Sequence, residues 1–130
     1  MSAPPLSGLA DLTRAGETIL IPYVMAGASE DWLEVIDAVI EAGASAVEVG
    51  LPFSDPMIDG PVIQAAADQA LDRGTTAAGV LAQLARRDFP VPLVAMTYYN
   101  VVDHLGLERF AGLATEAGIG GTILADLSLE

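Results

Sequence analysis

Apolar residues recur along the chain with two different spacings, and the two kinds of segment alternate. Short, continuous apolar runs rich in β-branched residues are typical of buried strands. These runs are residues 19–25, 45–51, 91–97 and 121–125. Between them, apolar residues recur every three or four positions, which predicts amphipathic helices over residues 5–15, 30–42, 61–73, 76–87 and 107–117. Strands and helices in alternation predict an α/β fold with a parallel sheet.

Residues that start or stop regular structure support these limits. Ser29 is the expected N-cap of the helix at 30–42, and Gly43 is its expected stop. Pro61 stands at the favoured first position of the next helix. Pro22 counts against a regular central strand at its own position, because proline cannot donate a ladder hydrogen bond.

The two faces of the second predicted strand differ in character. Val47 and Val49 share one bulky face, whereas Glu48 and Gly50 lie on the other. The segments "EAGASAVEV" and "EAGIGGTIL" form a weak internal repeat. The repeat places three further residues on the face of Glu48, namely Gly121, Ile123 and Ala125.

One bulky face and one face of small residues with an acid favour a narrow barrel interior over an open doubly wound sheet. A complete (βα)8 TIM barrel needs about 250 residues. Residues 1–130 are therefore predicted to form the N-terminal half of one such domain, with the first four or so strands.

Composition narrows the range of functions. The formal net charge is −13 with five lysines and arginines together, so the chain lacks the basic surface that nucleic acids need. No apolar run approaches the roughly 18 residues that cross a membrane. The N-terminus does not resemble a signal peptide, and the absence of cysteine fits a reducing compartment, so a cytoplasmic location is expected.

Two acidic residues are candidates for chemistry. A carboxylate in a buried strand is costly unless it is paired, yet every arginine lies in or beside a predicted helix, away from Glu48. A desolvated glutamate of this kind suits general acid–base catalysis, although a structural ion pair is the alternative. Asp59 directly precedes Gly60 and Pro61, where an ordinary helix N-cap is also plausible. Asp55 fits a simple turn.

The segment "VEVGLPFSDPMIDGPVIQ" at residues 47–64 resembles the signature of the tryptophan synthase α-subunit family. Three further stretches are similar to the first, third and fourth strands of that family. These stretches are "ILIPYVMAG", "MTYYN" and "GIGGTILADLSLE". The resemblance implies a (βα)8 barrel lyase of tryptophan biosynthesis that cleaves indole-3-glycerol phosphate into indole and glyceraldehyde 3-phosphate.

By the same resemblance, Glu48 is the general acid–base and Asp59 stabilises positive charge on the indole ring. Four other positions match the lining of the indole pocket, namely Tyr23, Tyr98, Ile123 and Ala125. Pro52 and Asp55 match the surface that docks on a pyridoxal-phosphate-dependent β subunit. No metal or cofactor is implied for this chain, since the pyridoxal phosphate belongs to the β subunit.

The chain also departs from the family pattern. Val101 and Ser128 stand where the family usually has proline, and His104 is a lone histidine expected in a surface loop. The family holds the substrate phosphate with loops after the seventh and eighth strands, which are not in the sequence. We therefore expect an isolated monomer of this chain to be nearly inactive.

Three alternatives remain open from the sequence. One is a non-catalytic fragment or interaction subunit that docks on and activates a β subunit. Another is a barrel acting on other sugar phosphates, and the third is a stand-alone lyase that releases free indole.

Overall fold

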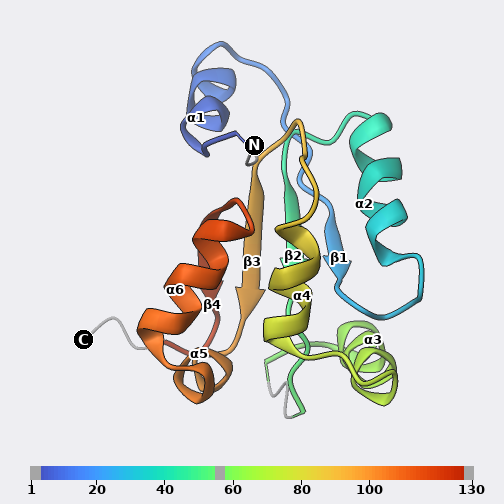
Figure 1. The fold of residues 1–130 in the computed structure, drawn as a ribbon. Helices are drawn as coiled ribbons and strands as arrows, with labels where there is room; N and C mark the ends of the chain where they lie inside the picture. The colour runs from blue at the N-terminus through green and yellow to red at the C-terminus, as the bar shows by residue number, and fades with distance from the viewer. Residues whose placement is uncertain (1–3, 55–57, 128–130) are drawn as a thin grey trace.

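The computed structural model describes residues 4–54 and 58–127, and these build a four-stranded, fully parallel sheet with helices around it (Figure 1). The strands are β1 (Tyr23–Met25), β2 (Val47–Gly50), β3 (Leu93–Thr97) and β4 (Ile119–Leu124). The helices are α1 (Ser7–Arg14), α2 (Trp32–Glu41), α3 (Pro61–Asp72), α4 (Ala77–Leu84), α5 (Tyr99–Leu105) and α6 (Leu107–Glu116). The strands are hydrogen-bonded in chain order, as in successive βα units of a barrel.

The hydrophobic core lies between one face of the sheet and helices α2, α4 and α6, which cover that face in Figure 1. Val47 and Val49 of β2 are fully buried there, as the side-chain alternation predicts. They meet Ile36 of α2 and Leu84 of α4, which are also fully buried. Helices α2, α4 and α6 are therefore held against the sheet by apolar packing.

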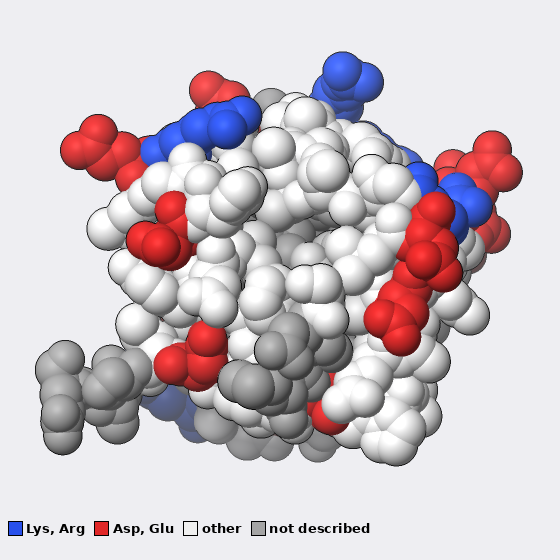
Figure 2. All heavy atoms as spheres, turned by 90° about the horizontal axis from the view of Figure 1, so that it is seen from below, with Lys and Arg blue, Asp and Glu red and all other residues white. Residues whose placement is uncertain are grey.

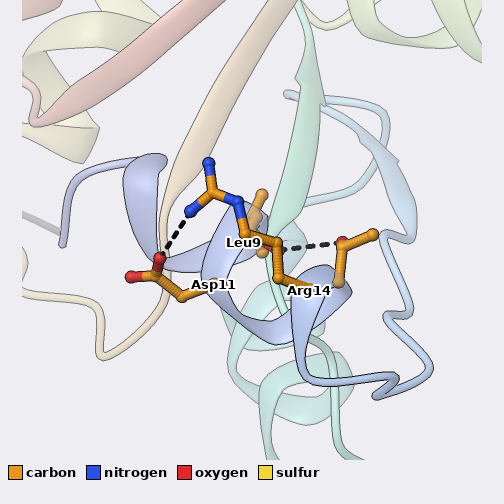
Figure 3. Close-up of polar contacts among 4 residues, drawn as sticks. Leu9, Asp11 and Arg14 are labelled. Atoms are coloured by element: carbon orange, nitrogen blue, oxygen red, sulfur yellow. Dashed lines mark hydrogen bonds and ion pairs between the residues drawn. The ribbon is translucent and has the colours of Figure 1, made fainter.

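Helix α1 lies at the amino ends of the strands (Figure 1). Just before it, Leu6 packs so close to β4 that a Cβ at Gly121 would stand 2.6 Å from the leucine Cδ1. Two polar contacts lie within the helix: Arg14 pairs with Asp11 at 3.1 Å, and the Thr13 hydroxyl donates to the Leu9 carbonyl (Figure 3). The two side chains of the ion pair are 77% and 75% exposed, so packing at Leu6 rather than charge holds this segment in place.

Several sequence predictions hold and a few are wrong. Pro61 opens α3, and Gly43 follows α2 with a φ of +112° that favours glycine. Strand β1 begins at Tyr23, so Pro22 directly precedes it; its carbonyl accepts a hydrogen bond of 2.9 Å from the backbone N–H of Glu48. The N-cap of α2 is Asp31, not Ser29; the Ser29 hydroxyl instead donates to the Asp31 carboxylate at 2.7 Å.

Helix α5 was not predicted, and His104 lies in its last turn rather than in a loop, although its side chain is exposed as expected. The segment contains adjacent valines and an asparagine, which have low helix propensity. Tertiary packing overrides that preference, because Val102 is 1% exposed within the core. No helix among the described residues is long and apolar enough to span a bilayer.

Substitution of Ile36 by alanine is expected to lower the free energy of unfolding by about 2–5 kcal/mol, because a fully buried branched side chain leaves a cavity. The measurement is urea unfolding followed by far-ultraviolet circular dichroism. Val35→Ala is the matched control on the same helix, since Val35 is 39% exposed, and should cost well under 1 kcal/mol. Equal losses for the two variants would contradict the placement of the core.

Candidate active site

The second face of the sheet carries the candidate residues, and strand register shows which of them are neighbours. Tyr23 of β1 pairs with Glu48 of β2, and Met25 pairs with Gly50. Paired residues in a parallel sheet point to the same side. We call this side the interior face; its members are Tyr23, Met25, Glu48, Gly50, Val94, Met96, Gly121 and Ile123. The prediction that Glu48 shares a face with Gly121 and Ile123 is therefore confirmed.

Glu48 is a carboxyl without a cation. Its side chain makes no hydrogen bond or ion pair with another described residue, and all five arginines lie on helices or their ends. The structural ion pair considered from the sequence is therefore absent from the described part of the chain. Glu48 is partly buried on this face rather than fully exposed.

Asp59 is not the helix cap that its position suggests. The N-cap of α3 is Gly60, and no side chain of the described residues caps that helix. The Asp59 carboxylate instead accepts a hydrogen bond of 3.1 Å from the Tyr98 hydroxyl at the end of β3. The Asp59 carbonyl also accepts from the Gln64 side-chain amide at 2.8 Å, so both ends of the residue are held.

Tyr98 connects the end of β3 to the residues just before α3, Ile58 and Asp59. Its hydroxyl donates to Asp59 and accepts from the backbone N–H of Ile58, each at 3.1 Å. Its ring packs against Phe53 with centroids 5.2 Å apart, and the residue is only 5% exposed. Burial raises the pKa of the Tyr98 phenol; the hydrogen bond from the Ile58 N–H opposes this rise and the Asp59 carboxylate adds to it, so the hydroxyl remains a hydrogen-bond donor. The sequence marked Tyr98 only as a pocket wall.

A second polar link was also missed by the sequence. The Asp126 carboxylate, just beyond β4, accepts from the backbone N–H of Tyr99 at 2.7 Å. It therefore satisfies one of the unpaired donors at the start of α5 and joins the ends of β3 and β4. An acid after a strand carries no signal of this contact, because its partner is distant in sequence.

Tyr23 crosses the interior face from β1 toward β2. Its hydroxyl lies over Gly50, where a Cβ would collide with it and stand 2.5 Å from Cζ. Burial, the Asp59 carboxylate and the Glu48 carboxylate, in that order, raise the pKa of Tyr23 to about 12. The phenol therefore lies within electrostatic range of both candidate acids.

Three of the four predicted pocket residues are brought together. Tyr23, Tyr98 and Ala125 line one small cavity with Asp59, at the carboxyl ends of the strands. Its volume of about 20 Å³ admits roughly one water molecule. Ile123 does not line it and is 40% exposed on the interior face. Seen from this end, most charged side chains of the described residues lie toward the edge of the molecule (Figure 2).

Of the two residues predicted to face a partner, Pro52 is buried and Asp55 lies outside the described residues, as does Ser128. Pro52 lines an apolar groove of about 420 Å³ between the start of α4 and α5, which Val101 and His104 also line. Within residues 4–54 and 58–127, no three acidic or histidine side chains gather in a way that would hold a metal ion.

The raised pKa of Tyr23 predicts a pH dependence of stability. The folded pKa is about 12 against an ordinary value of 10.0, so folding favours the protonated phenol. That contribution is complete below pH 10 and is lost as pH rises toward 12. Its ceiling is about 2–3 kcal/mol, and partial exposure of the ring reduces it. Urea unfolding from pH 9 to 12 should show a smaller decline for Tyr23→Phe; parallel curves would contradict the assignment.

An all-parallel βα array with carboxyls on its interior face and at its strand ends defines half of a (βα)8 barrel, the class whose sites form at that end. The family model described as tryptophan synthase alpha chain matches residues 9–130. The chain therefore belongs to the tryptophan synthase α-chain family.

Individual relatives agree with this assignment. The tryptophan synthase alpha chain of Bacillus cereus (strain ZK / E33L) is 47% identical over 121 residues, which are 88% of this chain and 46% of the relative. That of Synechococcus sp. (strain CC9902) is 45% identical over 123 residues, with 92% and 46% covered. The chain thus spans about half the length of the curated relatives it matches.

Solved structures show the same fold. The crystal structure of tryptophan synthase subunit alpha from Legionella pneumophila str. Paris matches with a TM-score of 0.87 at 36% identity, covering 93% of this chain and 48% of that one. Tryptophan synthase from M. tuberculosis, in an aminoacrylate- and BRD0059-bound form, matches at 0.85 with 29% identity, covering 99% and 53%.

Proposed function

We propose that this chain carries the acid–base residues of a carbon–carbon lyase that cleaves indole-3-glycerol phosphate into indole and glyceraldehyde 3-phosphate. The observation that carries the proposal is the pair of carboxyls. Glu48 lies on the interior face without a hydrogen bond or ion pair to another described residue, and Asp59 is held by Tyr98 at the carboxyl end of the same sheet. Membership of the tryptophan synthase α-chain family supports indole-3-glycerol phosphate as the proposed substrate.

In this proposal the Glu48 carboxyl first protonates C3 of the indole ring, which places positive charge on the ring nitrogen. The Asp59 carboxylate accepts a hydrogen bond from the ring N–H and stabilises that charge. Glu48 then removes the proton of the hydroxyl on the carbon attached to C3. The C–C bond breaks as the aldehyde forms, and its electron pair restores the neutral indole. The proton count balances, and Glu48 returns to its starting state.

The hydrogen bonds of Tyr98 support this division of roles. In the proposal Asp59 acts as a hydrogen-bond acceptor, and the hydrogen bond from the Tyr98 hydroxyl fixes its carboxylate at the carboxyl end of the sheet. Glu48 must exchange a proton twice in each turnover, and since no other described residue binds its carboxyl, both of its oxygens are available to the substrate. We propose no metal or cofactor for these steps.

The proposed partner is a pyridoxal-phosphate-dependent β subunit that docks near Pro52 and Asp55 and takes up the indole. Pro52 is buried in the chain and lines the groove beside α5. Because the chain spans about half the length of its relatives, the activity is proposed for the barrel once its remaining strands are supplied.

The test is to measure molecular mass by light scattering together with indole release from indole-3-glycerol phosphate. The samples are the chain alone, the chain with the remaining barrel strands of the α family, and each with a β subunit. Turnover is expected only in species with a completed barrel. Turnover by the 130-residue monomer would contradict the need for completion. A folded, completed barrel without turnover, with or without a β subunit, would contradict the lyase assignment.

A further inference from the structure

The hydroxyl of Tyr23 is a hydrogen-bond donor without a strong acceptor among the described residues. Among the described residues its one hydrogen-bond contact is to the Met25 sulfur at 3.9 Å, and thioether sulfur is a weak acceptor. The phenol is nevertheless placed on the interior face, next to Glu48 in the register and beside Asp59 and Tyr98 in the cavity. A donor in this position is available to a ligand.

Gly50 leaves the space that the Tyr23 hydroxyl occupies, because glycine has no Cβ. Any side chain there would start at a Cβ that collides with the Tyr23 hydroxyl and approaches Cζ to 2.5 Å. Gly50 has a strand conformation without a positive φ, so its backbone does not require glycine. The requirement comes from the close approach of the tyrosine.

The chemistry of the proposed substrate limits what this donor can meet. The indole ring carries an N–H donor but no oxygen or lone-pair nitrogen that accepts a hydrogen bond. The acceptors of indole-3-glycerol phosphate are the oxygens of its glycerol phosphate side chain. Near the point of bond cleavage, the hydroxyl that Glu48 deprotonates is one of them.

We propose that Tyr23 is a positioning residue that donates a hydrogen bond to a side-chain oxygen of indole-3-glycerol phosphate, with Gly50 keeping the space for its hydroxyl. This inference rests on the proposed lyase function. The role belongs to the Tyr23 hydroxyl and not to its aromatic ring, because a phenylalanine ring would pack against indole equally well. The raised pKa of Tyr23 keeps the proton on the phenol across the working pH range.

The test compares Tyr23→Phe with the wild type in the completed barrel with its β subunit. The kcat/KM for indole-3-glycerol phosphate should fall roughly tenfold, the value of one lost hydrogen bond. Affinity for free indole, measured by calorimetry, should stay within a factor of about two, because indole lacks the side-chain oxygens. Tyr99→Phe is the control: Tyr99 is 37% exposed and outside the cavity, so neither quantity should change.

Gly50→Ala tests the same inference without removing the hydroxyl. The new methyl group should displace the tyrosine and reproduce the selective loss for indole-3-glycerol phosphate. The Tyr23→Phe, Gly50→Ala double variant should lose no more than the worse single variant, since both changes remove one contact.

An unchanged kcat/KM in Tyr23→Phe, or an equal loss for substrate and free indole, would overturn the role of the hydroxyl while leaving the lyase proposal intact. Additive losses in the double variant would overturn the role of Gly50. A wild-type barrel that neither binds nor cleaves the substrate would overturn the lyase proposal and this inference together.

Discussion

Replacement of Glu48 by glutamine should lower kcat for indole release by about 10²–10⁴-fold in the completed barrel, the usual contribution of a general acid–base. Glutamine keeps the size and polarity of the side chain but neither donates nor accepts a proton at the required steps. Since Glu48 makes no hydrogen bond to another described residue, the change breaks no contact there. The thermal midpoint should therefore stay within a few degrees of the wild type.

The measurement is single-turnover indole release, with circular dichroism to confirm folding. Glu34→Gln is the matched control, because Glu34 is an exposed acid on α2, on the opposite side of the sheet. Glu34→Gln should retain full activity. A Glu48→Gln variant with more than about a tenth of wild-type kcat would remove Glu48 from the acid–base role.

Replacement of Asp59 by asparagine should lower kcat/KM by about 10²-fold, within the range seen when one preorganised electrostatic contact is lost. The amide oxygen of asparagine can still accept a hydrogen bond from the Tyr98 hydroxyl. Its backbone carbonyl can still accept the hydrogen bond from the Gln64 side-chain amide. The loop should therefore keep its position while the negative charge opposite the ring nitrogen is lost.

Two further variants separate charge from loop position. Tyr98→Phe removes the hydroxyl that holds Asp59 and Ile58, and should cost a smaller factor, about tenfold, because the charge remains. Asp68→Asn, at an exposed site on α3, should change nothing. If Asp59→Asn and Tyr98→Phe lose activity equally, loop position rather than charge is what Asp59 supplies.

The limits of sequence-based prediction follow from the kind of interaction involved. Local rules located Pro61 at the start of α3 and Gly43 after α2, because both depend on backbone geometry within a few residues. They failed for α5, where burial of Val102 against distant residues outweighs weak helix propensity. Local rules also predicted that Asp59 could cap α3. They could not identify its actual partner, Tyr98, which lies 39 positions away in the sequence.

Strand alternation, by itself, determined that Glu48 faces away from the helices together with Gly50, and the motif at 47–64 determined the family and the candidate acids. The orientation of Glu48 follows from the two-residue side-chain period of a strand, and the family follows from residue identities along a short segment. Only the tertiary structure decided what the acids contact: Asp59 meets Tyr98, whereas Glu48 has no hydrogen-bond or ion-pair partner among residues 4–54 and 58–127. It also placed Tyr23 over Gly50. Such contacts depend on how separate strands are brought side by side, and no local pattern carries that information.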